Sequence, residues 1–188
     1  MENPSITARI AIFVLITIAN ILLAQFAALT FSTQPGVITF YFAVAFMIAF
    51  ALWFGVWGAV AAYIGCLIGA GIPAGLPVSV NLYWSLADLW QVLIPLVAFG
   101  LLKADAALKT KRDFVIFMIF GWLLNNFVGA LWGAGTFVLS GQFATSKLSG
   151  LFANWFMGNL FVTVIISPVL LKFITPIVKK NGLFVENY

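Results

Sequence analysis

The stretch Gly36–Leu76, GVITFYFAVAFMIAFALWFGVWGAVAAYIGCLIGAGIPAGL, contains no Asp, Glu, Lys or Arg. A single helix needs about 20 apolar residues to cross the hydrocarbon core of a bilayer. Because this run is roughly twice that length, a break must fall inside it, and we place the break at Gly55. The stretch therefore predicts two consecutive membrane helices, at about 37–54 and 56–72.

The rest of the chain has the same apolar character. Of its 188 residues, 64% are hydrophobic and 7% are charged. A soluble domain carries about 25% charged residues, and a disordered chain combines low hydrophobicity with high charge. Both classes are excluded, and an integral membrane protein remains. Histidine is absent and Cys66 is the single cysteine, so metal and redox chemistry are poor candidates and we expect no cofactor.

Four more apolar segments complete an all-α, single-domain bundle of six transmembrane helices over residues 1–188. We expect these four helices at about 6–29, 82–102, 114–139 and 151–178. The first segment is long and lacks a clean cleavage site, so we interpret it as a retained helix and not as a signal peptide. The last is too long for one straight crossing, and Pro168 is expected to kink it or to start an interfacial turn.

The placement of charge predicts the orientation. Six crossings put both chain ends on one side, and that side carries eight basic residues while the other carries only Lys147. The eight are Arg9, Lys103, Lys109, Lys111, Arg112, Lys172, Lys179 and Lys180. By the positive-inside rule, both termini and the loop 103–113 are cytoplasmic, which places the chain in the cell membrane as a multi-pass protein. The net charge of +4 then reflects topology, and we expect no nucleic-acid partner.

Small residues recur at helical spacing. Gly65 and Gly69 form one small-xxx-small pair, and Gly129 and Gly133 form another. Such pairs let helix backbones approach closely. We expect them to pack inside the bundle, with a dimer interface as the less favoured alternative.

Asp88 is the one acidic residue inside a predicted apolar span. A lone carboxylate at depth costs at least about 2.5 kcal/mol, so it should face the bundle interior or water. Trp84, Ser85 and Gln91 share its helical face. A functional site is the favoured interpretation, and a carboxylate that only takes part in a packing network is the alternative.

Other polar and aromatic side chains are candidates for the same outward-facing cavity. Taken singly, Asn and Gln often only join membrane helices, and Trp also populates the interface. The predicted substrate-binding set is Asp88, Trp84, Gln91, Asn125, Asn154, Asn159, Trp132 and Trp155. A carboxylate with amides and tryptophans suits a small, cationic or zwitterionic, partly aromatic solute. Because no nucleophile–base pair, paired carboxylate or phosphate loop is present, we expect binding and not enzymatic catalysis.

Two stretches carry a family resemblance. Residues 53–70, WFGVWGAVAAYIGCLIGA, resemble helices 2–3 of the substrate-binding S-components of energy-coupling factor (ECF) transporters, and 158–171, GNLFVTVIISPVLL, resemble their last helix. The resemblance implies a vitamin or micronutrient binder with its ligand in the outer half, capped by loops near 30–36, 73–81 and 140–150. Transport would then be powered by partner ATPases.

The same resemblance implies a transmembrane coupling protein and two ATPase subunits as partners. The family docks the coupling protein through an Ala-x-x-x-Ala pair on helix 1. Here the strict pair, Ala24 and Ala28, falls near the outer end, whereas Ala8 and Ala11 lie near the inner end. We therefore expect Ala8 and Ala11 to be the docking residues.

A second resemblance competes with the first. The stretch Trp155–Leu171, with Ser-Pro-Val-Leu-Leu at 167–171, also resembles the last helix of MASE1-type membrane sensor domains. Those domains are usually longer and fused to a signalling domain, so here a separate partner would supply the output. The first hypothesis is thus an importer S-component, and the alternative is a membrane sensor or structural subunit without transport. A self-sufficient channel is a weaker third, because no inverted repeat is visible.

Overall fold

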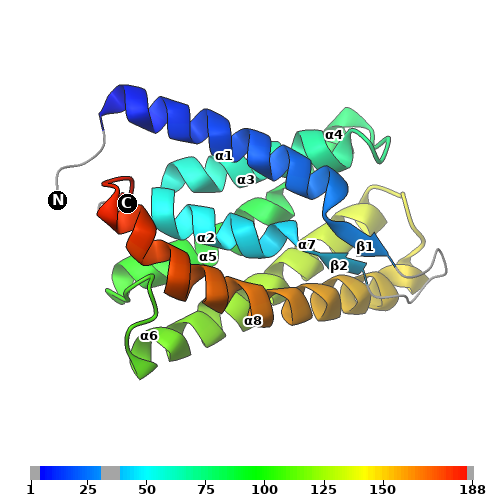
Figure 1. Cartoon of the computed structure of the whole chain (residues 1–188). Coiled ribbons are helices and arrows are strands. Elements are labelled where there is room, and N and C mark those ends of the chain that lie inside the picture. Colours follow the sequence, from blue (N-terminus) through cyan, green and yellow to red (C-terminus); the bar gives the residue numbers. More distant parts are fainter. Residues whose placement is uncertain (1–4, 31–38, 186–188) are drawn as a thin grey trace.

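The computed structural model describes residues 5–30 and 39–185. In this part of the chain, helices dominate and two short strands form a hairpin (Figure 1). The elements are α1 (Ile6–Phe26), β1 (Ala28–Thr30), β2 (Thr39–Tyr41), α2 (Ala43–Phe54), α3 (Val56–Cys66), η1 (Leu67–Gly71), α4 (Val78–Trp84), α5 (Leu86–Leu101), α6 (Lys111–Ile116), η2 (Phe117–Leu124), α7 (Asn125–Leu139), η3 (Thr145–Lys147) and α8 (Leu148–Lys180). The segments η1 and η2 are π-helical and η3 is a 3₁₀ turn.

Within residues 5–30 and 39–185, four helical rods are long and apolar enough to cross a membrane. They are α1, Val78–Leu101 (α4 and α5), Lys111–Leu139 (α6, η2 and α7) and Thr145–Lys180 (η3 and α8). Two shorter apolar rods, Ala43–Phe54 and Val56–Gly71, pack among them. The chain is thus a mostly helical, multi-pass membrane protein. That all six rods cross the bilayer stays a prediction.

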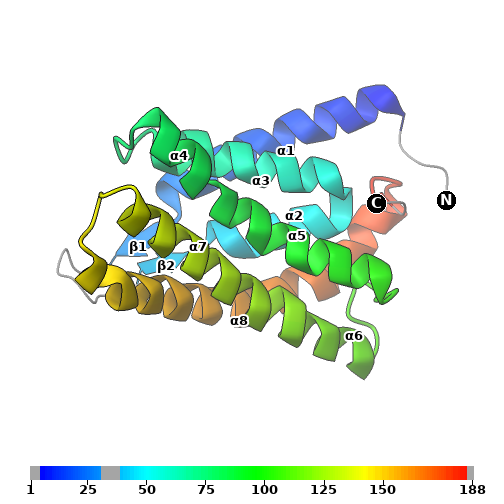
Figure 2. The same cartoon turned by 180° about the vertical axis from the view of Figure 1, so that it is seen from behind.

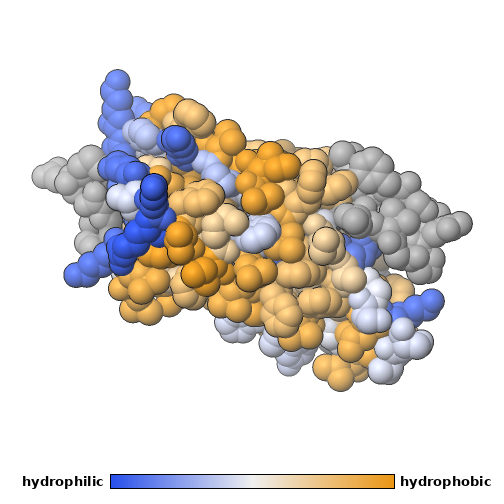
Figure 3. All heavy atoms as spheres, turned by 90° about the horizontal axis from the view of Figure 1, so that it is seen from below, coloured by the Kyte–Doolittle hydropathy of each residue, from blue (hydrophilic) through white to orange (hydrophobic). Residues whose placement is uncertain are grey.

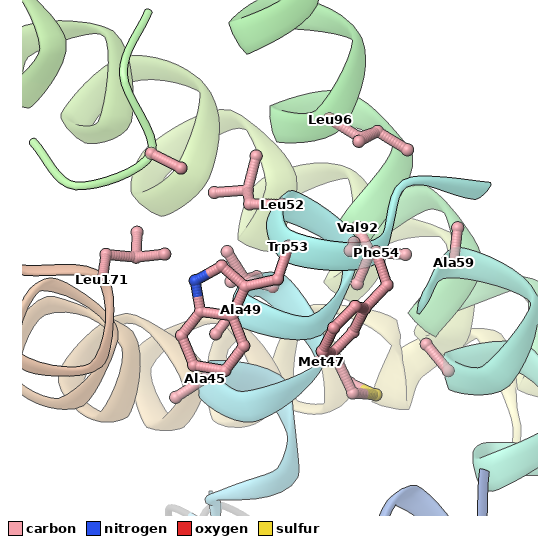
Figure 4. Packing of buried hydrophobic residues seen from close by; sticks show 14 of the residues in the cluster. Ala45, Met47, Ala49, Leu52, Trp53, Phe54, Ala59, Val92, Leu96 and Leu171 are labelled. Atoms are coloured by element: carbon pink, nitrogen blue, oxygen red, sulfur yellow. The ribbon is translucent and has the colours of Figure 1, made fainter. Parts of the chain in front are cut away.

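The helix α2 forms the centre of the bundle. Ten of its twelve residues are buried, and it packs against α3, α5 and α8. A helix that is apolar on all sides can be covered by neighbouring helices or by lipid, and here neighbouring helices cover it. Figure 4 shows α2 side chains such as Leu52 among Leu171 of α8 and Val92 of α5. The uncharged run permits this central position, and the packing of the neighbouring helices decides it.

The chain reverses direction at Gly55, between α2 and α3 (Figure 2). Gly55 has φ of 61°, a conformation that residues with a Cβ rarely adopt. Three residues later the two helices almost touch, since a Cβ on Gly58 would lie 2.4 Å from the carbonyl oxygen of Phe50. Glycine at these positions thus allows a tight helical hairpin.

The pair Gly65 and Gly69 packs against α1. A Cβ on Gly65 would lie 2.5 Å from Cβ of Asn20, and one on Gly69 would lie 2.3 Å from the carbonyl oxygen of Ile21. These distances leave no room for a larger residue. Within the described residues, this small-xxx-small pair is used inside the bundle, as the sequence favours.

The hairpin of β1 and β2 departs from the all-α prediction. The first helix was expected to reach Leu29, but α1 ends at Phe26 and Ala28 pairs with Tyr41 in an antiparallel register. This pairing provides hydrogen-bond partners in β2 for part of the backbone beyond the helix end. The second helix consequently begins at Ala43. The expected turn at 32–36 lies outside the described residues.

Two further boundaries differ from expectation. The fourth rod begins at Val78 and breaks at Ser85, whose hydroxyl donates to Oδ1 of Asn81 at 3.0 Å. The last helix runs unbroken from Leu148 to Lys180 through Pro168, so this proline starts no interfacial turn. Proline can remain inside a long membrane helix where neighbouring groups compensate the lost hydrogen bond.

The two ends of the bundle differ in polarity. The start of α1, the end of α8 and the loop 102–110 lie at one end (Figure 1). Hydrophilic side chains gather at that end and an apolar belt covers the middle of the visible face (Figure 3). This surface is that of a membrane-embedded protein.

Asp105 ties the loop 102–110 to α8. Its carboxylate contacts Nζ of Lys109 at 2.8 Å and Nζ of Lys179 at 3.1 Å. It also accepts a hydrogen bond from the backbone N–H of Ala107 at 2.8 Å. Partial burial raises the pKa of Asp105, but the bonds to Lys109, Ala107 and Lys179 outweigh it and lower the pKa to about 2.

We expect Gly58→Ala to destabilise the protein, because the new methyl group must push α2 and α3 apart at a cost of about 1–3 kcal/mol. The measurement is the thermal unfolding temperature of detergent-purified protein. Gly135→Ala is the matched control, since nothing lies within 4 Å of a Cβ at that helical position. Equal effects of the two substitutions would contradict the tight hairpin.

We expect Asp105→Asn to reduce stability at neutral pH but not in strong acid. A carboxylate whose pKa is lowered in the folded state stabilises that state above its ordinary pKa of 3.8, and this contribution is lost as the pH falls toward about 2. The side chain is partly exposed, so the difference should be about 1 kcal/mol or less. Unfolding temperatures of both proteins across this pH range provide the test, and a pH-independent difference would refute it.

Candidate ligand-binding site

A cavity of about 530 Å³ lies at the end of the bundle away from the loop 102–110. The end of α1, the strand hairpin, η1, the start of α5, the end of α7 and the start of α8 enclose it. Its described lining residues are Ala24, Gln25, Ala28, Tyr41, Cys66, Gly69, Ala70, Pro73, Ala74, Trp84, Asp88, Phe137, Leu151, Asn154, Trp155 and Asn159. The π-helical turn η1 forms part of the wall, and such turns are frequent at functional sites.

Asp88 is fully buried at this cavity. The break at Ser85 places it in the first turn of α5, where the positive end of the helix dipole favours a carboxylate. Tyr41 donates a hydrogen bond to its Oδ2 at 3.1 Å, while Oδ1 has no hydrogen-bond partner among the described residues. A buried carboxylate is costly unless it is paired. Oδ1 is therefore an acceptor that a bound ligand can satisfy.

Aromatic rings form one wall of the cavity. The rings of Trp84 and Phe137 stack with centroids 5.4 Å apart, and Trp155 meets Trp84 edge-on at 5.6 Å. Trp155 fits because α7 carries Gly133, where a Cβ would lie 2.2 Å from Cζ3 of the indole. Nε1 of Trp84 is buried without a described hydrogen-bond partner. The wall thus provides aromatic ring faces and, at Nε1 of Trp84, a hydrogen-bond donor without a described acceptor.

Amide side chains of α8 complete the lining. Asn154 and Asn159 both line the cavity. Asn159 is 1% exposed, and neither Oδ1 nor Nδ2 has a hydrogen-bond partner among the described residues. A buried amide in this state supplies one acceptor and two donors for a polar ligand.

The structure brings together five of the eight residues predicted to bind substrate: Asp88, Trp84, Asn154, Asn159 and Trp155. The other three do not line this cavity. Gln91 and Asn125 lie deeper and are fully buried. Gln91 lies directly against α7 at Gly129. A Cβ on Gly129 would lie only 2.3 Å from Cγ of Gln91. Trp132 lies on the outer side of α7 and donates to the carbonyl oxygen of Tyr83 at 2.7 Å.

Sequence reasoning missed several lining residues. Tyr41 makes a direct contact with Asp88, but it lies in a strand where a helix was expected. Cys66 and Phe137 sit in apolar runs that resemble ordinary core. Tyr41 is one of two tyrosines in the uncharged stretch 36–76, and a hydroxyl in such a stretch indicates a need for a polar partner without identifying it.

A family model named MASE1 matches residues 9–183. The chain belongs to the MASE1 family of membrane-associated sensor domains. This match supports the sensor alternative more than the importer reading, for which the comparisons give no support. Searches of curated proteins and of solved structures gave no match.

Beneath the cavity of this MASE1 chain, a buried polar network joins three helices. Nε2 of Gln91 donates to Oδ1 of Asn126 at 2.8 Å, and Nδ2 of Asn126 donates to Oγ1 of Thr163 at 2.9 Å. The Thr163 hydroxyl in turn donates to the carbonyl oxygen of Asn159 at 2.6 Å. The network therefore connects α5 and α7 to a cavity residue of α8, and it assigns Gln91 a packing role.

The adjacent residues Asn126 and Asn125 provide a matched test of this network. We expect Asn126→Leu to destabilise the MASE1 chain by about 1–2 kcal/mol, because it leaves Gln91 and Thr163 without their shared partner. Asn125→Leu should cost little or stabilise, since neither polar atom of the Asn125 side chain has a described hydrogen-bond partner. Thermal unfolding in detergent measures both, and the reverse order would overturn the assignment.

Proposed function

We propose that this MASE1 chain is a membrane sensor that binds a small cationic or zwitterionic solute in the cavity at Asp88. It acts by binding and not by enzymatic catalysis. The observation that carries the proposal is the fully buried Asp88 carboxylate, with one oxygen unpartnered among the described residues, facing a cavity of about 530 Å³.

The lining supports this class of ligand. A carboxylate pairs with a cation, and tryptophan faces attract cations and stack on rings. The volume falls within the range of roughly 300–1,000 Å³ that is typical of small-molecule sites. The amides of Asn154 and Asn159 would orient the polar groups of the solute. A zwitterion would place its cationic group at Asp88 and its anionic group at these amides or at Nε1 of Trp84.

We propose that the solute enters from outside the cell. Basic residues gather around the loop 102–110 and the end of α8, which favours a cytoplasmic position for that end in the cell membrane. The cavity lies at the opposite end. Both chain ends then lie inside, on the side where a signalling partner would be reached.

The helix α8 offers a physical connection between the two ends. Its first half lines the cavity through Trp155 and Asn159. Near its other end, Thr175 accepts a hydrogen bond from Nε1 of Trp53 at 2.8 Å, and Lys179 contacts Asp105. A solute that binds two arrangements of α8 unequally would shift the population between them. The proposed signal is such a shift.

The importer hypothesis is the weaker candidate. Its coupling protein and two ATPase subunits have no support from the family match. Ala8 is half-buried and Ala11 is exposed on the outer face of α1. Their role as docking residues stays a prediction tied to that hypothesis.

We expect Asp88→Asn to weaken binding of the cationic solute by at least about tenfold, because a neutral amide loses the charge pair. A panel of choline, betaine and phenethylamine is screened by thermal shift on the detergent-purified chain, and calorimetry then measures the affinity of any hit. Mass spectrometry of molecules that co-purify with the wild-type chain extends the panel.

Asn125→Leu is the control for this test, since it alters a buried amide outside the cavity and should bind as the wild type does. An unchanged affinity in Asp88→Asn would refute the site. Selective binding of anionic solutes would refute the proposed ligand class.

A further inference from the structure

A second cavity, of about 630 Å³, lies at the end of the bundle that carries the basic residues. It is formed by the loop before α6, the start of α6 and the second half of α8. Its described lining residues are Leu108, Lys109, Thr110, Lys111, Phe114, Val115, Pro168 and Lys172. The cavity thus combines three lysines with an apolar wall, and no acidic residue is among those described as lining it.

Two of the three lysines are uncompensated by acidic groups. Lys109 is paired with Asp105, but neither Lys111 nor Lys172 makes an ion pair with the described residues. The nearby carboxylate of Asp113 accepts hydrogen bonds from the backbone N–H groups of Thr110 at 2.9 Å and Asp105 at 3.1 Å, and among the described residues it makes no ion pair with Lys111 or Lys172. Lys111 and Lys172 therefore carry positive charges at the cavity that could pair with a bound anion.

Lys172 is exposed on the outer face of α8. It precedes the helix end at Lys180 by eight residues, or about 12 Å along the axis. Its neighbours Val169 and Phe173 on that face are 53% and 62% exposed. A lysine on an apolar, membrane-facing surface is costly unless its ammonium group reaches the interface or an anion. Lys111 and Lys172 line the same cavity.

We propose that this cavity binds the headgroup of an anionic phospholipid of the cytoplasmic leaflet. The phosphate would lie between Lys111 and Lys172, and an acyl chain would follow the exposed side chains of Phe114 and Val115, which are 44% and 53% exposed. Basic pockets between membrane helices on the cytoplasmic side are suited to such headgroups. The apolar wall beside the lysines favours a lipid over a free phosphate ion. The proposal is independent of the solute bound at Asp88.

The inference is tested with the full chain in nanodiscs of phosphatidylcholine, with and without phosphatidylglycerol. We expect phosphatidylglycerol to raise the unfolding temperature of the wild-type chain and to remain bound in native mass spectrometry. In the double variant Lys111→Gln/Lys172→Gln, binding should weaken about thirtyfold, or about fivefold for each lysine lost. Lys180→Gln removes a charge at the same end but outside the cavity, so it should bind phosphatidylglycerol as the wild type does.

Two single variants at Lys172 and a comparison with inorganic phosphate complete the test. Lys172→Arg keeps the charge and should keep binding, and the single variant Lys172→Gln should lose it in part, so the proposal is testable even if the double variant unfolds. Equal binding by the wild type and by Lys172→Gln would overturn the proposal. So would the same loss in Lys180→Gln, which would indicate a diffuse surface effect. Stabilisation by inorganic phosphate equal to that by phosphatidylglycerol would overturn the lipid assignment.

Discussion

The burial of α2 on all its faces is the constraint on which the rest of the structure depends. An apolar helix without a polar side can lie at the centre of a bundle without burying polar side chains, and α1, α3, α5 and α8 pack around it here. The helix is short and begins only at Ala43, after the strand that holds Tyr41. The neighbouring helices continue beyond that point, and none of the described cavity-lining residues belongs to α2. The cavity is therefore the space beyond the start of the central helix.

The buried polar residues of the bundle differ in whether their hydrogen-bond partners lie within the described part of the chain. Below the cavity, Gln91, Asn126 and Thr163 are hydrogen-bonded to one another and hold α5, α7 and α8 together. At the cavity, Asp88 and Asn159 retain polar atoms without described partners. Oε1 of Gln91 and both polar atoms of Asn125 also lack described partners, although neither residue lines the cavity. An unpartnered atom therefore indicates a ligand site only where it also lines the cavity, as at Asp88 and Asn159, because a bound ligand can there offset the cost of its burial. The proposed anionic-lipid site at Lys111 and Lys172 lies at the other end, so the two binding sites would act on opposite halves of α8.

The amino-acid sequence alone indicates an apolar, helical membrane protein, a break at Gly55 and an Asp88 that faces the interior of the bundle. These inferences rest on local physics: charge is expensive in a bilayer wherever it lies, and helix length is limited by bilayer thickness. The short resemblance at the last helix also pointed to the MASE1 family, although the importer resemblance was ranked above it. A periodic Gly/Ala pattern reports close helix packing, which many membrane families share, and so it could not discriminate between them.

Only the tertiary structure decided which polar residues face one another. Gln91 lies on the same helical face as Asp88, yet it meets Asn126 because α7 comes close at Gly129. Tyr41 and Asp88 are 47 positions apart, and their contact depends on a strand pairing between Ala28 and Tyr41 that no local pattern indicated. Helical periodicity fixes the face on which a side chain lies. The neighbour it meets is fixed by how the other helices pack, and that is a property of the whole bundle.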